Sequence, residues 1–167
     1  MAENEADTAQ QEANQKIIQP KKLYLKDVSF ETPNSPRIFT KNWDPEINVE
    51  FQISATEIDT DLYEVVITLT VTTSTSGETA YLAEVHQAGI FVMQGFDAQD
   101  LPQKQNVYCV RILYPYASAA VSDLVSRGGF PQLVLSPLNF AQIYSNRTTR
   151  PGESTSEDSE ETEQQQA

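Results

Sequence analysis

Two strand-like runs of apolar positions organise the chain between residues 61 and 92. In the first half of this stretch, apolar residues recur at every second position, and many of them are β-branched. These positions are Tyr63, Val65, Ile67, Leu69 and Val71. A period of two in such a run predicts a long strand with one buried face. The polar segment 72–78 contains Gly77 and predicts a turn, after which residues 79–92 return as the second strand of an antiparallel hairpin.

Two further strands are predicted before this hairpin. Residues 46–58 alternate most regularly, which predicts one face against a core and the other in water. The apolar face would carry Ile47, Val49, Phe51, Ile53 and Ala55. Residues 21–31 form the first predicted strand. Strict alternation would place Leu23, Leu25, Asp27, Ser29 and Glu31 on one of its faces, and Tyr24, Val28 and Phe30, with Lys26 among them, on the other.

The strand predicted over 79–92 has no clearly polar face. One face would carry Tyr81, Ala83, Val85, Gln87 and Phe91. The other would carry Leu82, Glu84, His86, Ala88 and Ile90. A single subunit would leave part of this strand uncovered, so a second layer supplied by another chain is expected.

Beyond residue 106 the apolar period lengthens and predicts a long helix over 107–127, with 94–106 as a linker before it. The residues at helical spacing are Val110, Leu113, Tyr114, Ala117, Val121, Leu124 and Val125. Pro115 would bend this helix, and Gly128 would end it in the left-handed conformation.

The last predicted elements are an extended segment and a short helix. Residues 130–135 are apolar but contain Pro131, which favours an extended segment over a central strand. Ser136, followed by proline, would cap a short helix from 137 to about 147. The predicted fold class is therefore α+β: a four-stranded antiparallel sheet, a long helix, an extended crossover segment and a short C-terminal helix.

The net charge of −13 is concentrated at the two ends of the chain. Residues 1–19 contain four acids and one base, and residues 151–167 contain six acids and no base. Both ends are rich in Gln, Glu, Ser and Thr, with little to bury, which predicts disorder. The expected organisation is a disordered tail at 1–19, one domain at 20–149 and a disordered acidic tail at 150–167.

Composition also narrows the class of partner and the compartment. An acidic chain argues against binding nucleic-acid phosphate as the main task. One cysteine, Cys109, rules out an internal disulfide. The first residues lack the basic and apolar regions of a signal peptide, and no apolar run reaches membrane-spanning length. We therefore expect a cytosolic protein that does not insert into the membrane directly.

The residue pattern predicts neither an enzyme nor a cofactor. Neither a GxxxxGK[ST] loop nor a GxGxxG turn is present, and one histidine with one cysteine do not make a metal cluster. His86 and Cys109 are formally a nucleophile pair, but a solitary helix cysteine is usually a small core residue. Asp59 and Asp61 indicate a solvated turn.

Aromatic residues gather instead outside the regular strands. They are Phe39, Trp43, Phe96, Phe130, Phe140 and Tyr144. Each of them could simply close the rim of the core. As a set, they could line a groove between the sheet and the extended segment, where apolar side chains bind and free strand edges pair with an extended backbone. This pattern favours a peptide-binding surface without catalysis.

Several sequence blocks, spread through residues 20–145, match a known family in the same order along the chain. They are KDVSFETPNSP at 26–36, WDPE at 43–46, YEVV at 63–66, ETAYLAEV at 78–85, QAGIF at 87–91, LYPYA at 113–117 and SRGGFPQL at 126–133. With these blocks the chain resembles the SecB family of bacterial protein-export chaperones. The resemblance implies a homotetramer, built as a dimer of dimers, that holds unfolded preproteins in the cytoplasm without ATP and passes them to SecA, the export motor.

The resemblance also implies roles for individual residues, carried over by position. SecA-binding residues would be Asp27, Glu31, Leu82 and Glu84. Tetramer contacts would be Ala83, Val85 and Gln87. The client groove would be lined by Trp43, Tyr81, Phe130, Leu133, Phe140 and Tyr144. Without the resemblance, the carboxylates alone indicate ordinary solvated side chains.

Other functions remain open on the sequence. The same fold would suit a SecB-like chaperone of a toxin–antitoxin system, or a general peptide-binding adaptor. A small-molecule enzyme on an α+β scaffold would need a polar pocket that the sequence does not show.

Overall fold

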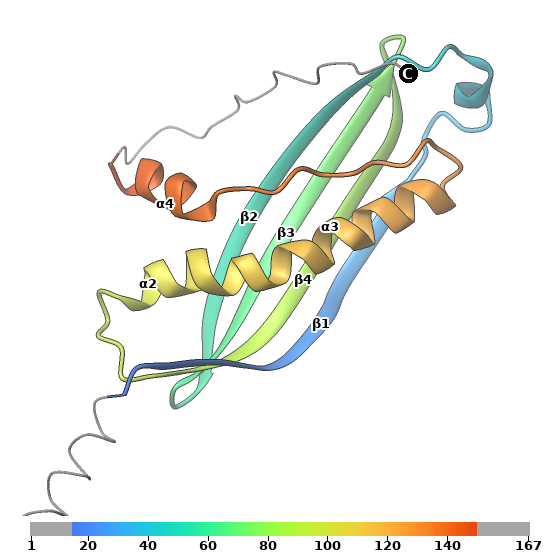
Figure 1. Ribbon diagram of the computed structural model, residues 1–167. Helices are drawn as coiled ribbons and strands as arrows, with labels where there is room; N and C mark the ends of the chain where they lie inside the picture. The colour runs from blue at the N-terminus through green and yellow to red at the C-terminus, as the bar shows by residue number, and fades with distance from the viewer. Residues whose placement is uncertain (1–14, 150–167) are drawn as a thin grey trace, which may run out of the picture.

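Four long strands form one antiparallel sheet in the computed structural model, which describes residues 15–149 (Figure 1). The strands are β1 (Ile17–Glu31), β2 (Pro45–Asp59), β3 (Leu62–Thr75) and β4 (Glu78–Gln94). Their order is β1-β4-β3-β2, so the predicted hairpin lies at the centre and β1 and β2 are the edges. The predicted four-stranded antiparallel sheet is confirmed.

The disordered tails expected at 1–19 and 150–167 lie outside the described residues, except for residues 15–19. Within that short stretch β1 already begins at Ile17, ahead of the expected domain boundary. The turn between β3 and β4 is also tighter than predicted. Only Ser76 and Gly77 form it, with φ of 51° and 75°. A two-residue turn with both φ values positive matches the twist of the flanking strands, so both strands continue up to it.

β1 has an extra residue at Lys21 and another at Lys26 that stand outside the pairing with β4. Each extra residue reverses the alternation of side chains along the strand. The predicted grouping of residues 21–31 is therefore wrong. The face toward the helices carries Leu23, Leu25, Val28 and Phe30, and the opposite face carries Tyr24, Asp27, Ser29 and Glu31.

A continuous helical run crosses one face of the sheet (Figure 1). It consists of α2 (Leu101–Gln103), the π-helical η2 (Lys104–Cys109) and α3 (Val110–Arg127). The run starts earlier than the predicted residue 107, because Pro102 lies in the first turn, where proline is tolerated.

The end of the long helix also differs from the prediction. Gly128 keeps a right-handed φ of −69°, and Gly129 is the left-handed residue with φ of 85°. A side chain at Gly128 would come within 2.4 Å of the Phe30 ring, so glycine is needed there for close packing. The left-handed residue that ends the helix is therefore Gly129 and not Gly128.

Residues 130–139 form the extended crossover segment, which returns over the helix side of the sheet to α4 (Phe140–Thr149) (Figure 1). The predicted Ser136 cap is wrong. Asn139 accepts a hydrogen bond from the Gln142 backbone N–H at 3.2 Å, and the Ser136 carbonyl instead accepts one from the Tyr114 hydroxyl at 2.6 Å. The short helix therefore starts at Phe140.

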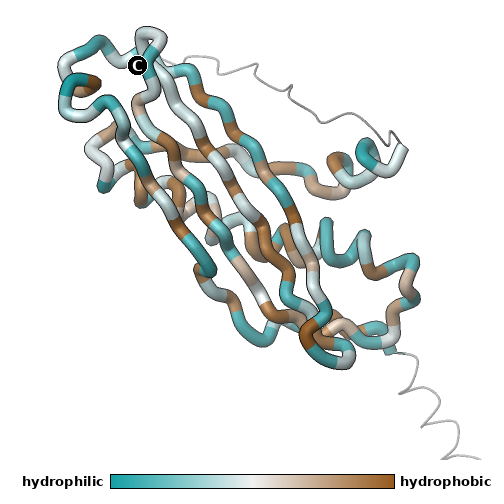
Figure 2. Tube along the Cα trace, turned by 180° about the vertical axis from the view of Figure 1, so that it is seen from behind, coloured by the Kyte–Doolittle hydropathy of each residue, from teal (hydrophilic) through white to brown (hydrophobic). Residues whose placement is uncertain are grey.

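The core lies between α3 and the central hairpin. Four residues of the predicted apolar face of β3 are fully buried there: Val65, Ile67, Leu69 and Val71. No helix in the described part of the chain covers the other side of the sheet, as Figure 2 shows from behind. The two sides of the sheet therefore offer two different surfaces.

Candidate functional site

The open side of the sheet brings together the four residues of the predicted acidic contact. Asp27 and Glu31 lie on β1, and Leu82 and Glu84 lie on the neighbouring β4. Pairing sets Glu31 opposite Leu82, and Ser29 opposite Glu84, so all four side chains share one face. Glu31 and Glu84 thus lie next to Leu82, while Asp27 lies farther along the same face, opposite His86; we call this surface the acidic face.

Hydrogen bonds orient the acidic face. Nε2 of His86 lies 2.8 Å from one Glu84 carboxylate oxygen, and the Thr70 hydroxyl donates to the other oxygen at 3.3 Å. Asp27 accepts a hydrogen bond from the Val28 backbone N–H at 2.9 Å. Asp27 and Glu31 are exposed, so their charges can meet a cation from outside.

A polar cluster that sequence reasoning missed adjoins the acidic face. The Tyr24 hydroxyl donates to Glu64 on β3, and Nζ of Lys26 lies 2.8 Å from a Glu64 oxygen. The hydrogen bond from Lys26, followed by that from Tyr24, lowers the pKa of Glu64. Its hydrogen bond to Glu64 raises the pKa of Tyr24 to about 12. Tyr24 reaches β3 across β4, which accounts for the full burial of Ala88 opposite it.

The helix side carries large apolar side chains that remain exposed. We call them the apolar stripe; they are Phe39 (50% exposed), Trp43 (38%), Ile47 (40%), Val49 (40%) and Val134 (76%). The crossover segment starts at Phe130, whose ring packs against Trp43 at 5.6 Å between centroids. It leads to Phe140, whose ring packs against Phe51 at 5.7 Å. The segment therefore leads from the residues just before β2 to Phe51 of β2, and Val134 lies within it.

The predicted groove residues divide into surface and interior. Trp43 is exposed, and Leu133 and Tyr144 are half-buried. Tyr81, Phe130 and Phe140 are buried in the single chain. Tyr81 supports Phe130 at a centroid distance of 4.9 Å, so these rings form the floor beneath the exposed residues.

Three residues of the stripe were not predicted to line a groove: Ile47, Val49 and Val134. Phe39 belonged to the aromatic set that could line a groove, but not to the groove residues that the resemblance implies. Ile47 and Val49 were placed on a face against a core, but α3 crosses β3 and β4 and leaves that part of β2 exposed. The alternation in β2 identified which side chains face the helices, but not which of them a helix covers.

The predicted tetramer contacts lie inside the single protomer. Ala83, Val85 and Gln87 are buried on the helix side of β4, and the Gln87 side chain donates to the Tyr24 carbonyl at 3.0 Å. They have little surface of their own to offer another subunit. Exposed apolar residues occur instead on the β1 edge and on the helical run: Leu25, Val28, Tyr108 and Tyr116.

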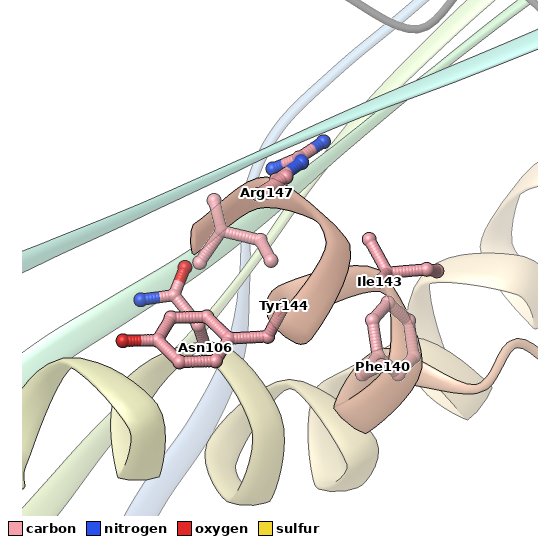
Figure 3. A pocket seen from close by; sticks show the side chains of 6 residues that line it. Asn106, Phe140, Ile143, Tyr144 and Arg147 are labelled. Atoms are coloured by element: carbon pink, nitrogen blue, oxygen red, sulfur yellow. The ribbon is translucent and has the colours of Figure 1, made fainter. Parts of the chain in front are cut away.

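A small pocket lies between α4, β2 and the helical run. It is lined by Ile53, Asn106, Phe140, Ile143, Tyr144 and Arg147. Figure 3 shows the Tyr144 ring beside Asn106 and Arg147 reaching toward β2, where its guanidinium lies 5.1 Å from the centre of the Phe51 ring. The pocket has room for about one water molecule. It is too small for a substrate.

The formal Cys–His pair does not assemble. Cys109 is buried in the core on the helix side, while His86 lies on the open side of the sheet. Burial raises the pKa of the Cys109 thiol to about 12, so it stays protonated and is a weak nucleophile. Among residues 15–149, no group of three His, Cys, Asp or Glu side chains is arranged to hold a metal ion, and no helix is long and apolar enough to cross a bilayer.

Comparison with known proteins gives a consistent result. Residues 10–151 match the family model of SecB, the preprotein translocase subunit. The chain is 43% identical over 145 residues to the protein-export protein SecB of Hydrogenovibrio crunogenus, which covers 87% of this chain and 97% of the relative. It is 38% identical over 161 residues to that of Marinobacter nauticus, with 96% and 98% covered.

A solved structure shares the fold. The Mycobacterium tuberculosis SecB-like chaperone Rv1957, in complex with a ChAD peptide from the HigA1 antitoxin, aligns with a TM-score of 0.62. The alignment covers 72% of this chain and 90% of that chain at 19% identity. At this identity, the likeness concerns the architecture of the sheet and helices.

Proposed function

Since this chain belongs to the SecB family, we propose that it is an ATP-independent cytosolic holdase that binds unfolded preproteins and delivers them to SecA. A role as a protein-export chaperone follows from family membership. We assign client binding to the apolar stripe and SecA binding to the acidic face. The proposal makes the protein a binding protein rather than an enzyme.

The apolar stripe is the observation that carries client binding. Its residues are exposed on the connector before β2, on β2 and on the crossover segment, and an unfolded chain that bound there would bury them. Many weak apolar contacts over a long surface tolerate varied client sequences. The outer edge of β2 pairs with no strand among the described residues, so its backbone can also bond an extended client.

The acidic face suits SecA if the motor offers a basic segment with an apolar anchor. Carboxylates attract such a segment and fix its register, while Leu82 gives the apolar anchor a contact. This face and the apolar stripe lie on opposite sides of the sheet. Client and motor would therefore bind at the same time, and delivery would not require competition for one surface.

A homotetramer built as a dimer of dimers completes the proposal. The exposed apolar residues of β1 and of the helical run support it, because such surface is usually covered by a partner. Buried Ala83, Val85 and Gln87 would influence assembly indirectly, through the packing of α3. A solution mass equal to that of one 18.7 kDa chain would contradict this assembly.

Charge reversal tests the assignment of the motor face. Asp27→Lys combined with Glu84→Lys should weaken SecA binding about tenfold or more at low salt, with a smaller effect at high salt. Affinity for an unfolded client should stay unchanged. The matched control is Glu46→Lys with Glu57→Lys, two exposed carboxylates on the opposite edge of the sheet. Unchanged SecA titration in the first variant, or equal weakening in the control, would contradict the assignment.

A further inference from the structure

The connector between β1 and β2, residues 32–44, carries two of the five stripe residues. Apart from η1 (Arg37–Thr40), it has no regular structure. It presents Phe39 and Trp43 to solvent, while Ile38 is buried in the core. What holds this connector therefore decides how two aromatic side chains of the stripe are oriented.

The tip of the β3–β4 hairpin holds the connector at its end. The Thr75 hydroxyl donates to the Asn42 carbonyl and accepts from the Asp44 backbone N–H, both at 3.0 Å. Nearer the start of the connector, the side-chain amide of Asn34 donates to the Thr79 carbonyl at 3.0 Å. Both contacts flank the Ser76–Gly77 turn.

Glu78 holds the middle of the connector from the same tip. One of its carboxylate oxygens lies 2.8 Å from Nζ of Lys41 and 3.4 Å from the Arg37 guanidinium. These two cations stand on either side of Phe39 in the sequence. The other oxygen of Glu78 is shielded from solvent and has no hydrogen-bond partner among the described residues, so the contacts with Lys41 and Arg37 are the polar contacts of this carboxylate. The hydrogen bond from Lys41 lowers the pKa of Glu78 below its ordinary value of 4.5.

The aromatic rings continue this connection toward the crossover segment. The Phe39 and Trp43 rings both pack against Phe130, at centroid distances of 4.9 and 5.6 Å. Phe130 in turn rests on Tyr81 of β4. A shift of the connector would therefore change both exposed rings and their shared support together.

We propose that Glu78 is a positioning residue for client binding, which fixes Phe39 and Trp43 in the orientation that receives an apolar client segment. This inference rests on the proposed function, since it assumes that the apolar stripe is the client site. Fixing the rings before binding lowers the conformational cost of ordering them in the complex. The assignment separates Glu78 from an ordinary surface ion pair, whose loss would leave client affinity unchanged.

The chain offers its own reporter, because Trp43 is the single tryptophan. Acrylamide quenching of its fluorescence measures the order of the connector without any client. Client affinity is measured separately, as the Kd for fluorescently labelled, reduced and carboxymethylated α-lactalbumin, a permanently unfolded probe. In Glu78→Gln, Trp43 quenching should rise about twofold and the Kd should increase about fivefold, with far-UV circular dichroism unchanged.

Two further variants separate the loss of the Glu78–Lys41 contact from the loss of one negative charge. Lys41→Met breaks the same contact from the connector side and should reproduce both changes. The exchange of Glu78→Lys with Lys41→Glu restores the pair in reverse and should return quenching and Kd toward the native values. Glu57→Gln, an exposed carboxylate on β2, is the control for loss of one charge.

Each outcome is decisive. Unchanged Trp43 quenching in both Glu78→Gln and Lys41→Met would overturn the inference. Increased quenching with an unchanged Kd would overturn the link to client binding, and would also contradict the assignment of the stripe as client site. If the native protein does not bind the unfolded probe, the proposed function fails, while the quenching experiment still tests whether Glu78 orders the connector.

Discussion

Val134 offers the cleanest perturbation of the apolar stripe. It lies in the middle of the crossover segment and is 76% exposed, the largest exposure among the big apolar side chains of residues 15–149. Replacing it with Asp removes little packing from the folded protein. Substitutions at such surface positions change stability by about 0.5 kcal/mol or less. Any large effect of Val134→Asp would therefore arise in the complex with a client.

The expected magnitude follows from the exposed area. Full burial of a valine is worth about 1.5 kcal/mol at the lower end of the usual range. Since 76% of Val134 is exposed, a client that covers it would gain about 1.1 kcal/mol, or about sixfold in Kd. The carboxylate of the variant must also lose hydration under a client, so the total weakening should reach about tenfold.

Fluorescence anisotropy of a labelled unfolded polypeptide measures this effect. The matched control is Ile58→Asp, which introduces the same charge at a 49% exposed apolar residue at the far end of β2. Val134→Asp should weaken binding and Ile58→Asp should not. Equal binding by Val134→Asp and the native protein would refute the reasoning. Equal weakening by both variants would mean that charge, and not the stripe, governs affinity.

Further predictions concern the floor of the stripe and the polar cluster on the open side. Phe140→Ala should lower the free energy of unfolding by about 3–5 kcal/mol in a urea titration, because its buried ring packs against Tyr114 and Phe51. Phe39→Ala should change stability far less and weaken client binding instead; the reverse pattern would contradict the division into floor and surface. The lowered pKa of Glu64 gives stability that is complete above the ordinary value of 4.5 and is lost as the pH falls through the lowered folded value. Glu64→Gln should therefore flatten the decline of the melting temperature on acidification below about pH 5, and an unchanged slope would contradict the role assigned to Lys26 and Tyr24.

The strands could be predicted because apolar residues recur at every second position of the sequence. The pairing of β2 with β3 is regular from Pro45 to Glu57, and the faces predicted over this range agree with the structure. β1 could not be assigned in the same way. Its extra residues at Lys21 and Lys26 reverse the faces, and lysine is a residue type that gives no signal of a bulge. The helical run was predicted from residue 107 because Pro102 suggested a linker.

The candidate site could be predicted in part. The resemblance to the family named the four residues of the acidic face, and the structure brings them onto one face of two adjacent strands. The apolar stripe depends on which part of the sheet α3 leaves uncovered, and this is a property of packing. Ile47 and Val49 have the same alternation as Phe51 and Ile53, yet only the second pair packs against the core. Periodicity therefore identified the face of β2 but could not identify its exposed half.

Whether this protein holds unfolded chains at all is decided by light scattering from a precursor diluted out of denaturant. With a stoichiometric amount of the protein, scattering should stay low, equally with and without ATP, and Val134→Asp should protect less well than Ile58→Asp. If the precursor aggregates as fast with the protein as without it, the apolar stripe is not a surface for non-native polypeptide.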